Sequence, residues 1–389
     1  MTPQEDLQKA KGVVNGLLAQ VAKVGATELF LTTEYPPAGR IDNKIVQLMK
    51  EPLAADSCRK MAQSICDERR WQVFLARSSV SFIFTSPSGR FRASLFMQQR
   101  RVGMVIRHLP GVMPTIDEAG LSEVIKPIVL ADKGLIVIAS PSGNGRTTTL
   151  AAALDHRNRF SQGHIVAIEE MIEFPQPHKQ CIVTQREIGS DTPHMRAALS
   201  DAFHQAANAI FVSDVIDSDS LSLTMRHVEA GRLVVISVVA EDSVDAIRKL
   251  VELYPANKRE EASLALSTTL AAVCAQQIAT RQDGGALLVT EMLVGTHRVL
   301  RDVARGDLSG LKGCMESDQK FGMHTFNQRL FDFYESGVID LNCALFFSDD
   351  RISLRFRLRT ESSRYDAEGG EGGGEQESLM PKSDAILSV

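Results

Sequence analysis

The chain has 389 residues, 44% of them hydrophobic and 23% charged, so it is long enough for two or three domains with sizeable cores. A formal net charge of −5 and 6% aromatic residues give no general attraction to nucleic acid or to anionic membranes. Six scattered cysteines without a C-x-x-C pair argue against a zinc site or a disulfide framework and favour reduced cytosolic thiols. The polar N-terminus predicts no signal peptide, and no apolar run approaches the ~20 residues that span a bilayer.

The first part of the chain, residues 1–108, predicts a domain of mixed α and β structure. Apolar residues at helical spacing predict a helix over residues 5–24 that stops at Gly25. The segment 89–109, GRFRASLFMQQRRVGMVIRHL, alternates apolar and polar residues with a period of two, which predicts a β-hairpin. Two prolines and a glycine in LPGVMPT then predict a linker over residues 109–118.

The second part, residues 119–360, alternates short buried runs with helical segments. Its strand-like runs are GLIVIAS, HIVAIEE, AIFVSD and LVVISVVA, and each is followed by a helix-like segment. This alternation predicts βαβ units and a mainly parallel sheet. The Ala-rich segment EEASLALSTTLAAVCAQQIAT, residues 260–280, predicts one long helix.

The last segment, residues 361–389, is rich in glycine and glutamate. Its seven acidic and two basic residues give it a net charge of −5, so the rest of the chain is formally neutral. A segment of this composition buries too little apolar surface to fold, which predicts a disordered acidic tail.

The segment IASPSGNGRTTTL, residues 138–150, lies between a buried strand and a helix, as a phosphate-binding P-loop does. Gly143 and Gly145 allow the backbone to approach phosphate closely, and Thr147 stands where a hydroxyl holds Mg²⁺. Ser140 replaces the first glycine of the motif. Arg146 replaces its lysine, and a wide planar guanidinium is not equivalent to a compact ammonium. The loop predicts a phosphate site, with a plain Gly/Ser turn as the alternative.

The surrounding residues resemble the PilT/PilU family of type IV pilus retraction ATPases, and they are closer to PilU. The resemblance runs from about Gly25 to Phe346, and CIVTQRE and FGMHTFNQ are its specific stretches because no general strand or helix pattern demands them. It implies an α/β fold, with a PAS-like N-terminal α+β domain before a RecA-like P-loop ATPase core that has a mainly parallel sheet and C-terminal helices. It also implies a ring of six subunits, with ATP between the two domains and the neighbouring subunit.

The resemblance also implies roles for single residues. Glu169, in IEEMIEF, matches the residue that polarises the attacking water, and Asp214 matches the carboxylate of the Walker B motif. The implied cofactors are ATP and Mg²⁺, with Thr147 and Asp214 at the metal. The implied nucleotide-binding residues are Ser142, Gly143, Asn144, Gly145, Arg146, Thr147 and Thr148, together with Arg92 and Arg107 of the N-terminal domain.

The implied partners are further copies of this chain or paralogous retraction subunits, and a platform protein in the inner membrane. The expected location is cytoplasmic, at the periphery of the inner membrane, without direct membrane insertion and without nucleic acid.

Several positions depart from the family pattern. Asp214 is one methylene shorter than the family's glutamate, Val239 stands in place of a histidine, and Met171 replaces a proline. Ser200 and His204 occupy positions where relatives carry arginines. Because one well-aimed charge is typically worth about 10²–10³ in rate, we expect an accessory subunit with weakened hydrolysis.

Other interpretations remain open. The chain could be a fully active retraction motor, an interaction subunit that binds no nucleotide, or, more remotely, a small-molecule P-loop kinase. Glu169 could be a solvated loop charge, and Arg92 and Arg107 could be the solvent face of the hairpin. His204 and His227 are predicted to be ordinary helix-surface histidines.

Overall fold

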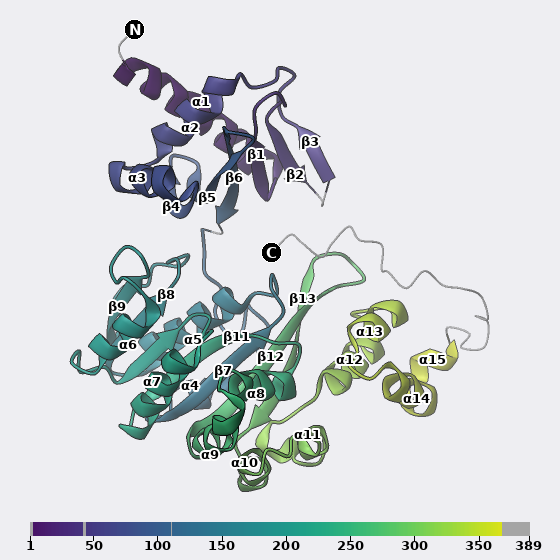
Figure 1. Cartoon of the computed structure of the whole chain (residues 1–389). Coiled ribbons are helices and arrows are strands. Elements are labelled where there is room, and N and C mark those ends of the chain that lie inside the picture. Colours follow the sequence, from purple (N-terminus) through teal and green to yellow (C-terminus); the bar gives the residue numbers. More distant parts are fainter. Residues whose placement is uncertain (1–2, 42–43, 110, 368–389) are drawn as a thin grey trace. The chain divides into compact units, whose positions relative to one another are not determined.

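The computed structural model describes residues 3–41, 44–109 and 111–367. The chain divides into two compact units, one ending at Val112 and the other beginning at Met113 (Figure 1). The predicted linker, residues 109–118, includes Ile116, which is only 2% exposed and packs in the core of the second unit. The second half of that segment is therefore part of the second unit.

The first unit is a six-stranded antiparallel sheet with helices packed on it. The strand order is β3-β2-β1-β6-β5-β4. The strands are β1 (Glu28–Leu31), β2 (Ala38–Ile41), β3 (Lys44–Gln47), β4 (Ser79–Ser86), β5 (Gly89–Gln98) and β6 (Arg101–Leu109). The helices are α1 (Pro3–Val24), α2 (Ala55–Ile65) and α3 (Glu68–Arg77).

The helix and the hairpin that were predicted for this unit are both present and form its core. The predicted first helix is α1, and Gly25 ends it with a left-handed φ of 67°. The predicted hairpin is β5 and β6, whose inward residues Phe91, Ala93 and Leu95 are at most 1% exposed. These side chains form one apolar cluster with α1 and α2.

The second unit is built on a seven-stranded sheet, in the order β13-β12-β7-β11-β10-β8-β9. Neighbouring strands are parallel from β12 to β9, and only β13 runs antiparallel, at one edge. The strands are β7 (Gly134–Ser140), β8 (Gly163–Glu169), β9 (Cys181–Glu187), β10 (Ala209–Val212), β11 (Leu233–Val239), β12 (Leu270–Thr280) and β13 (Ala286–Val294).

Helices cover both faces of this sheet. On one face, Ile136 and Ile138 of β7 pack with α4 (Ile125–Val129) and α5 (Arg146–Phe160). On the other face, Leu135 and Val137 pack in a larger core. That core includes α6 (Met195–Ala202), α7 (Ser218–Glu229), α8 (Ser243–Glu252), α9 (Arg259–Thr269), α10 (His297–Ala304) and α11 (Leu311–Ser317). The predicted alternation of strands and helices is observed for β7, β10 and β11, whereas β9 follows β8 without an intervening helix and was not predicted.

One element differs in kind from its prediction. Residues 260–280 were expected to form a single helix, but α9 ends at Thr269 and β12 begins at Leu270. The backbone of Leu270 is already extended, with φ −67° and ψ 120°. The strand lies between β7 and β13 and is almost entirely buried, so packing outweighs the helical preference of its alanines.

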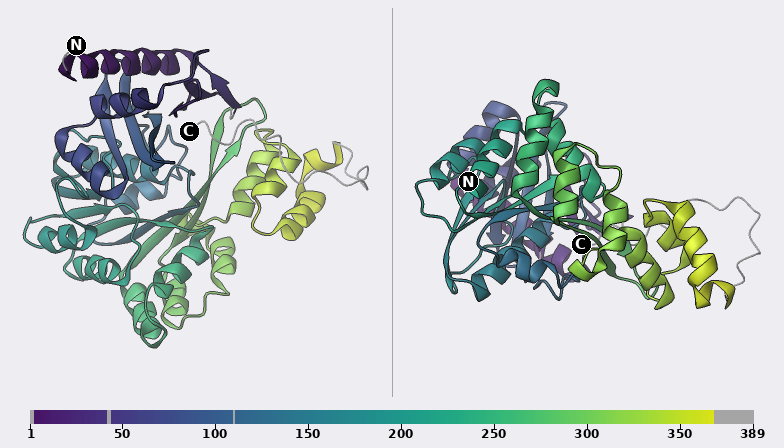
Figure 2. Two further views of the ribbon diagram at one scale, coloured as in Figure 1. Left: turned by 45° about the horizontal axis from the view of Figure 1, so that its top comes forward. Right: turned by 90° about the horizontal axis from the view of Figure 1, so that it is seen from below.

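The C-terminal helices lie beside the β12–β13 edge of the sheet, as Figure 2 shows. They are α12 (Phe326–Glu335), α13 (Leu341–Phe347), α14 (Arg351–Glu361) and α15 (Ser363–Ala367). The predicted disordered tail started at residue 361, which is too early, because α14 includes that residue and Tyr365 of α15 is only 7% exposed. The remainder of that prediction, residues 368–389, lies outside the described residues.

Candidate functional site

The loop between β7 and α5 has the backbone of a phosphate cradle. Ser140 ends β7 fully buried, and Arg146 begins α5. Gly143 and Gly145 have left-handed φ values of 82° and 76°, a conformation that glycine adopts without strain. The first N–H groups of a helix have no partner within it, so the start of α5 can donate to an anion.

Arg146 folds back across this loop instead of extending away from it. Its guanidinium donates to the Ser140 carbonyl at 2.7 Å and lies 3.1 Å from the Asp214 carboxylate. The Arg146 side chain is 13% exposed, and no polar atom in the described part of the chain accepts a hydrogen bond from its buried Nε. The arginine therefore joins the P-loop directly to the acidic residue that follows β10.

Asp214 is held in a fixed position by the neighbouring strand. The hydroxyl of Ser237 on β11 accepts from the Asp214 N–H at 2.9 Å and donates to its Oδ1 at 3.1 Å. Asp214 has a left-handed φ of 45°, which aspartate tolerates better than most residues. Because β10 and β11 are parallel neighbours, their carboxyl ends meet at one edge of the sheet, where such folds place ligands.

Glu169, at the end of β8, is buried and not a solvated loop charge. Its side chain is only 7% exposed, and it accepts a hydrogen bond from Gln185 at 2.8 Å. It lines a small, mostly apolar cavity against α5. Burial raises the pKa of this carboxyl from 4.5 to about 7, and the charges of Glu173 and Glu187 act in the same direction.

The segment after Glu169 is folded over it by hydrogen bonds to neighbouring strand ends. The Glu170 N–H donates to the Ser213 hydroxyl at 3.1 Å, and the Ile172 N–H donates to the Glu187 carboxylate at 3.2 Å. The Glu173 N–H donates to the Met171 carbonyl at 3.0 Å, which closes a turn at the position of the family's proline. These bonds fix the path of the chain between Glu169 and Phe174, and Phe174 lines the same cavity as Glu169.

A group of residues on β12 contacts the P-loop and was not predicted from the sequence. Gln276 is fully buried, accepts from the Thr149 hydroxyl at 2.8 Å and donates to the Asn144 carbonyl at 2.6 Å. The Ile278 N–H donates to the Asn144 side chain at 2.8 Å. The signal was the stretch AQQIATRQDG, but the expected helix over residues 260–280 hid which of its residues face the loop.

The remaining predicted positions are dispersed. Val239 ends β11 directly opposite Ser140 and is 47% exposed. His204 is exposed in the turn after α6, whereas His227 is fully buried, so its prediction as a surface histidine was wrong. His227 stacks on Phe203 at 3.7 Å between ring centroids, and burial lowers its pKa to about 4.

Arg92 and Arg107 belong to the first unit. They lie directly opposite each other on β5 and β6, the first half-buried and the second exposed.

The residues present fit a phosphate group better than they fit a metal ion. The glycines and the start of α5 leave open backbone for phosphate, since a Cβ added at Gly143 would meet nothing within 4 Å. Asp214, by contrast, already faces the guanidinium of Arg146, which repels a cation at the same carboxylate. Among the described residues there is no group of three or more His, Cys, Asp or Glu side chains that could hold a metal ion.

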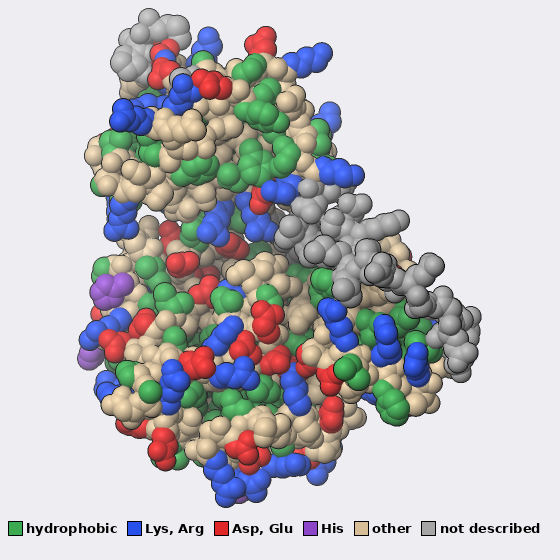
Figure 3. All heavy atoms as spheres, turned by 45° about the vertical axis from the view of Figure 1, so that its right-hand side comes forward, with side chains coloured by type: hydrophobic (Ala, Val, Ile, Leu, Met, Phe, Trp, Pro, Cys, Tyr) green, Lys and Arg blue, Asp and Glu red, His purple; other side chains and the backbone are tan. Residues whose placement is uncertain are grey.

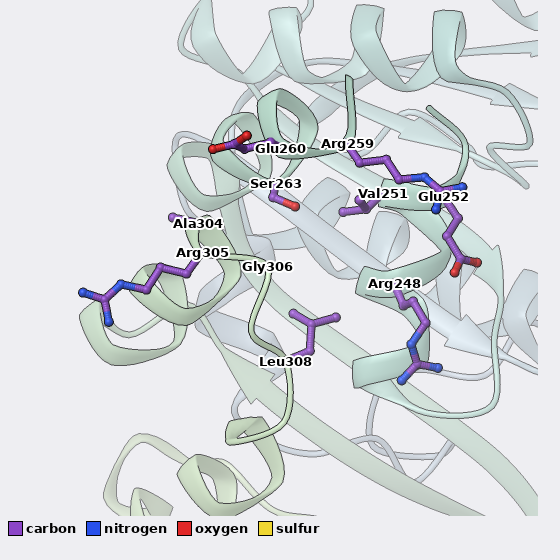
Figure 4. A pocket seen from close by; sticks show the side chains of 10 residues that line it. All are labelled: Arg248, Val251, Glu252, Arg259, Glu260, Ser263, Ala304, Arg305, Gly306 and Leu308. Carbon is purple, nitrogen blue, oxygen red and sulfur yellow. The ribbon is translucent and has the colours of Figure 1, made fainter. Parts of the chain in front are cut away.

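On the face of the second unit that Figure 3 shows, acidic and basic side chains are interspersed and form no large patch of one charge. A cavity of about 350 Å³ lies between α8, α9 and the end of α10. The guanidinium groups of Arg248, Arg259 and Arg305 lie at separate edges of it and do not converge (Figure 4). Across the described ranges, no helix combines the length and the apolar character needed to cross a membrane.

Comparison with known proteins identifies relatives over most of the chain. Residues 49–321 match the family described as Type II/IV secretion system protein. The chain is 31% identical over 348 residues to the Type IV pilus ATPase PilU of Pseudomonas aeruginosa, covering 89% of this chain and 91% of that protein. It is 29% identical over 327 residues to the Type IV pilus retractation ATPase PilT of the same organism, covering 84% and 95%.

A solved structure of the pilus retraction motor PilT with bound ADP has a TM-score of 0.80 to this chain at 30% identity. The match covers 88% of this chain and 99% of that one. The predicted fold class, an N-terminal α+β domain followed by a RecA-like core, is thereby confirmed.

Proposed function

Because this chain belongs to the Type II/IV secretion system protein family, and within it to the PilT/PilU group, we propose that it binds ATP and hydrolyses it weakly. In this proposal it is an accessory subunit of the machinery that retracts type IV pili. The names of its relatives support the biological setting, and the ADP in the PilT structure supports the ligand. The geometry of the P-loop supports retention of binding with loss of rate.

The observation that carries the proposal is the contact between Arg146 and Asp214. In a working phosphoryl-transfer site, the P-loop cation faces the phosphates and a separate carboxylate serves the metal shell. Here the two charges neutralise each other at 3.1 Å, and Ser237 holds Asp214 in place. Nucleotide and metal must therefore separate this pair before either residue can act.

Two further positions support slow turnover. Val239 offers neither a proton nor a hydrogen bond at the end of β11. Glu169 has a pKa matched to a general base near neutral pH, but at 7% exposure it is closed off from water. Losses of this kind are not additive, so we assign the combined effect at least about 10² in rate and do not multiply them.

The residues that would hold the nucleotide are those of the P-loop. The backbone of Gly143 and Gly145 and the start of α5 would donate to the phosphates, with Thr147 beside them. Bound Mg²⁺ would supply charge neutralisation on the phosphate oxygens. Thr147 and, once released by Arg146, Asp214 are the oxygen ligands available to it.

The assembly is also a proposal. We infer a ring of six subunits, made of this chain alone or mixed with a paralogous retraction ATPase, in which Arg92 and Arg107 reach toward phosphate. The identity to PilU and PilT over most of the chain supports this assembly. The expected platform protein, the location at the cytoplasmic side of the inner membrane and the absence of nucleic acid remain predictions.

The test is to restore the altered positions. The variant R146K/D214E/V239H should turn over ATP at least about 10-fold faster than the native chain, because the charges at the phosphates and the metal are restored. R159K is the matched control, since Arg159 lies at the other end of the same helix, where it forms an ion pair with Asp155. A native rate already equal to that of an intact relative would instead establish a fully active motor.

A separate experiment tests the alternative that the chain is an interaction subunit that binds no nucleotide. A ligand at ~100 times its dissociation constant raises the unfolding free energy by about 2.7 kcal/mol. If ATP leaves the melting temperature unchanged at all concentrations tried, the chain binds no nucleotide and the proposed function is wrong.

A further inference from the structure

Strand β12 continues past the end of its neighbour β7. The paired registers of the two strands end at Ala275 and Ala139, while β12 runs on to Thr280. Beyond that point the P-loop takes the place of the missing strand. The Ile278 N–H donates to the Asn144 side chain at 2.8 Å, which occupies a backbone donor on the side of β12 that β7 has left.

Gln276 makes the second connection, from inside the core. It is fully buried, and both ends of its amide are engaged. Its Oε1 accepts from the Thr149 hydroxyl on α5 at 2.8 Å, and its Nε2 donates to the Asn144 carbonyl at 2.6 Å. One side chain thus joins the loop before Gly145 to the first turns of the helix after it.

The glycine between these two contacts is closely packed. A Cβ added at Gly145 would lie 3.3 Å from Gln276 Nε2 and 3.5 Å from Ile278 Cδ1, at a left-handed φ of 76°. The loop is therefore fixed on its inner side by β12, while Ser142 and Gly143 stay exposed on its outer side. A loop ordered before binding loses less conformational entropy when the ligand arrives.

We propose that Gln276 and Asn144 are positioning residues that hold the P-loop in its phosphate-binding shape before nucleotide arrives. This inference rests on the proposed function, because ordering of the loop affects affinity only if the loop binds nucleotide. Gln276 acts through the loop backbone and does not touch the phosphates. The ion pair of Arg146 with Asp214 changes the charge that faces the phosphate site, whereas the contacts of Gln276 and Asn144 act on the shape of the loop. Binding can therefore persist where hydrolysis is weak.

The first experiment measures binding of ATP carrying a methylanthraniloyl fluorophore, with Mg²⁺, to the full chain. Q276A and N144A should each weaken the affinity by about 10-fold, because each removes hydrogen bonds that order the loop. Q277A is the matched control, since Gln277 is the next residue of the same strand and its pairing in that strand is with Val289 of β13, away from the P-loop; its affinity should equal that of the native chain.

The second experiment measures hydrogen exchange without nucleotide. Amides of residues 142–149 should exchange at least about 10-fold faster in Q276A and N144A, while the rest of the second unit stays as protected as in the native chain. N144A keeps the test valid if Q276A fails to fold, because Asn144 lies in the loop and not in the core. Its melting temperature should equal that of the native chain.

The outcomes separate the two proposals. Native affinity and native exchange in N144A would overturn the positioning role while leaving nucleotide binding intact. If the native chain binds no labelled ATP but the exchange changes as expected, Gln276 and Asn144 do order the loop, and the proposed function is wrong.

Discussion

Replacing Glu169 by glutamine should remove a pH dependence from the stability of the second unit. The carboxyl is 7% exposed, accepts one hydrogen bond from Gln185 and faces an apolar cavity. Burial therefore raises its pKa from 4.5 to about 7. Glutamine keeps the acceptor oxygen and the approximate volume, but it has no charge at any pH.

The magnitude follows from proton linkage. Between pH 4.5 and about 7 the folded chain binds more protons at Glu169 than the unfolded chain does, so its unfolding free energy falls as the pH rises. The contribution is complete below pH 4.5 and is lost above pH 7. At about 1.4 kcal/mol per pH unit, the full effect is at most about 3 kcal/mol.

The assay is urea unfolding of the native chain and of E169Q at pH 5 and pH 8, followed by a signal from the second unit. The variant should gain about 2–3 kcal/mol relative to the native chain between these two pH values. E170Q is the matched control, because Glu170 is the next residue and is exposed. Parallel pH profiles for the native chain and E169Q would refute the reasoning, and would mean that the carboxylate is charged and solvated in the folded chain.

Two further predictions concern close contacts elsewhere in the second unit. Lys312 lies 2.5 Å from the fully buried Glu291, so K312M should leave that charge uncompensated and lower the unfolding free energy by about 3–5 kcal/mol; the double variant K312M/E291M should recover much of the loss in the same urea titration. A Cβ added at Gly322 would lie 2.0 Å from Val124 Cγ2 at a φ of 79°, so G322A should cost at least about 2 kcal/mol. A melting temperature within 2 °C of the native value, about a third of the expected shift or less, would contradict the second prediction.

The sequence predicted those parts of the fold where a local pattern has one explanation. The short apolar run at 135–139, rich in β-branched residues and bounded by turn residues, favours a buried strand, and the period-two alternation of 89–98 favours a half-buried strand. The P-loop could be found for the same reason, since Gly143 and Gly145 stand between such a strand and a helix.

The sequence-based predictions failed where tertiary contacts determine the local structure. Residues 270–280 have a composition that suits a helix, and neither glycine nor proline marks the break at Leu270. Only their position between two strands makes them a strand. The error concealed Gln276, since a residue in a surface helix has no reason to contact a loop 132 positions away.

The ion pair of Arg146 with Asp214 could likewise not be predicted from the sequence. Both substitutions were recognised one at a time, but their contact depends on β10 lying two strands away from β7 with β11 between them. The sequence also gave no reason to expect the burial of Glu169, because a glutamate at a strand end is usually solvated.

The most direct test of the central claim is ATP turnover by the purified chain, measured beside equilibrium binding of labelled ATP with Mg²⁺. The expected result is binding in the micromolar range (a ΔG of about −8 kcal/mol) together with turnover at least about 10²-fold slower than that of an intact PilT-type relative under the same conditions. Turnover at the rate of that relative would contradict the account, and would mean that Arg146 leaves Asp214 readily and that both residues still serve catalysis.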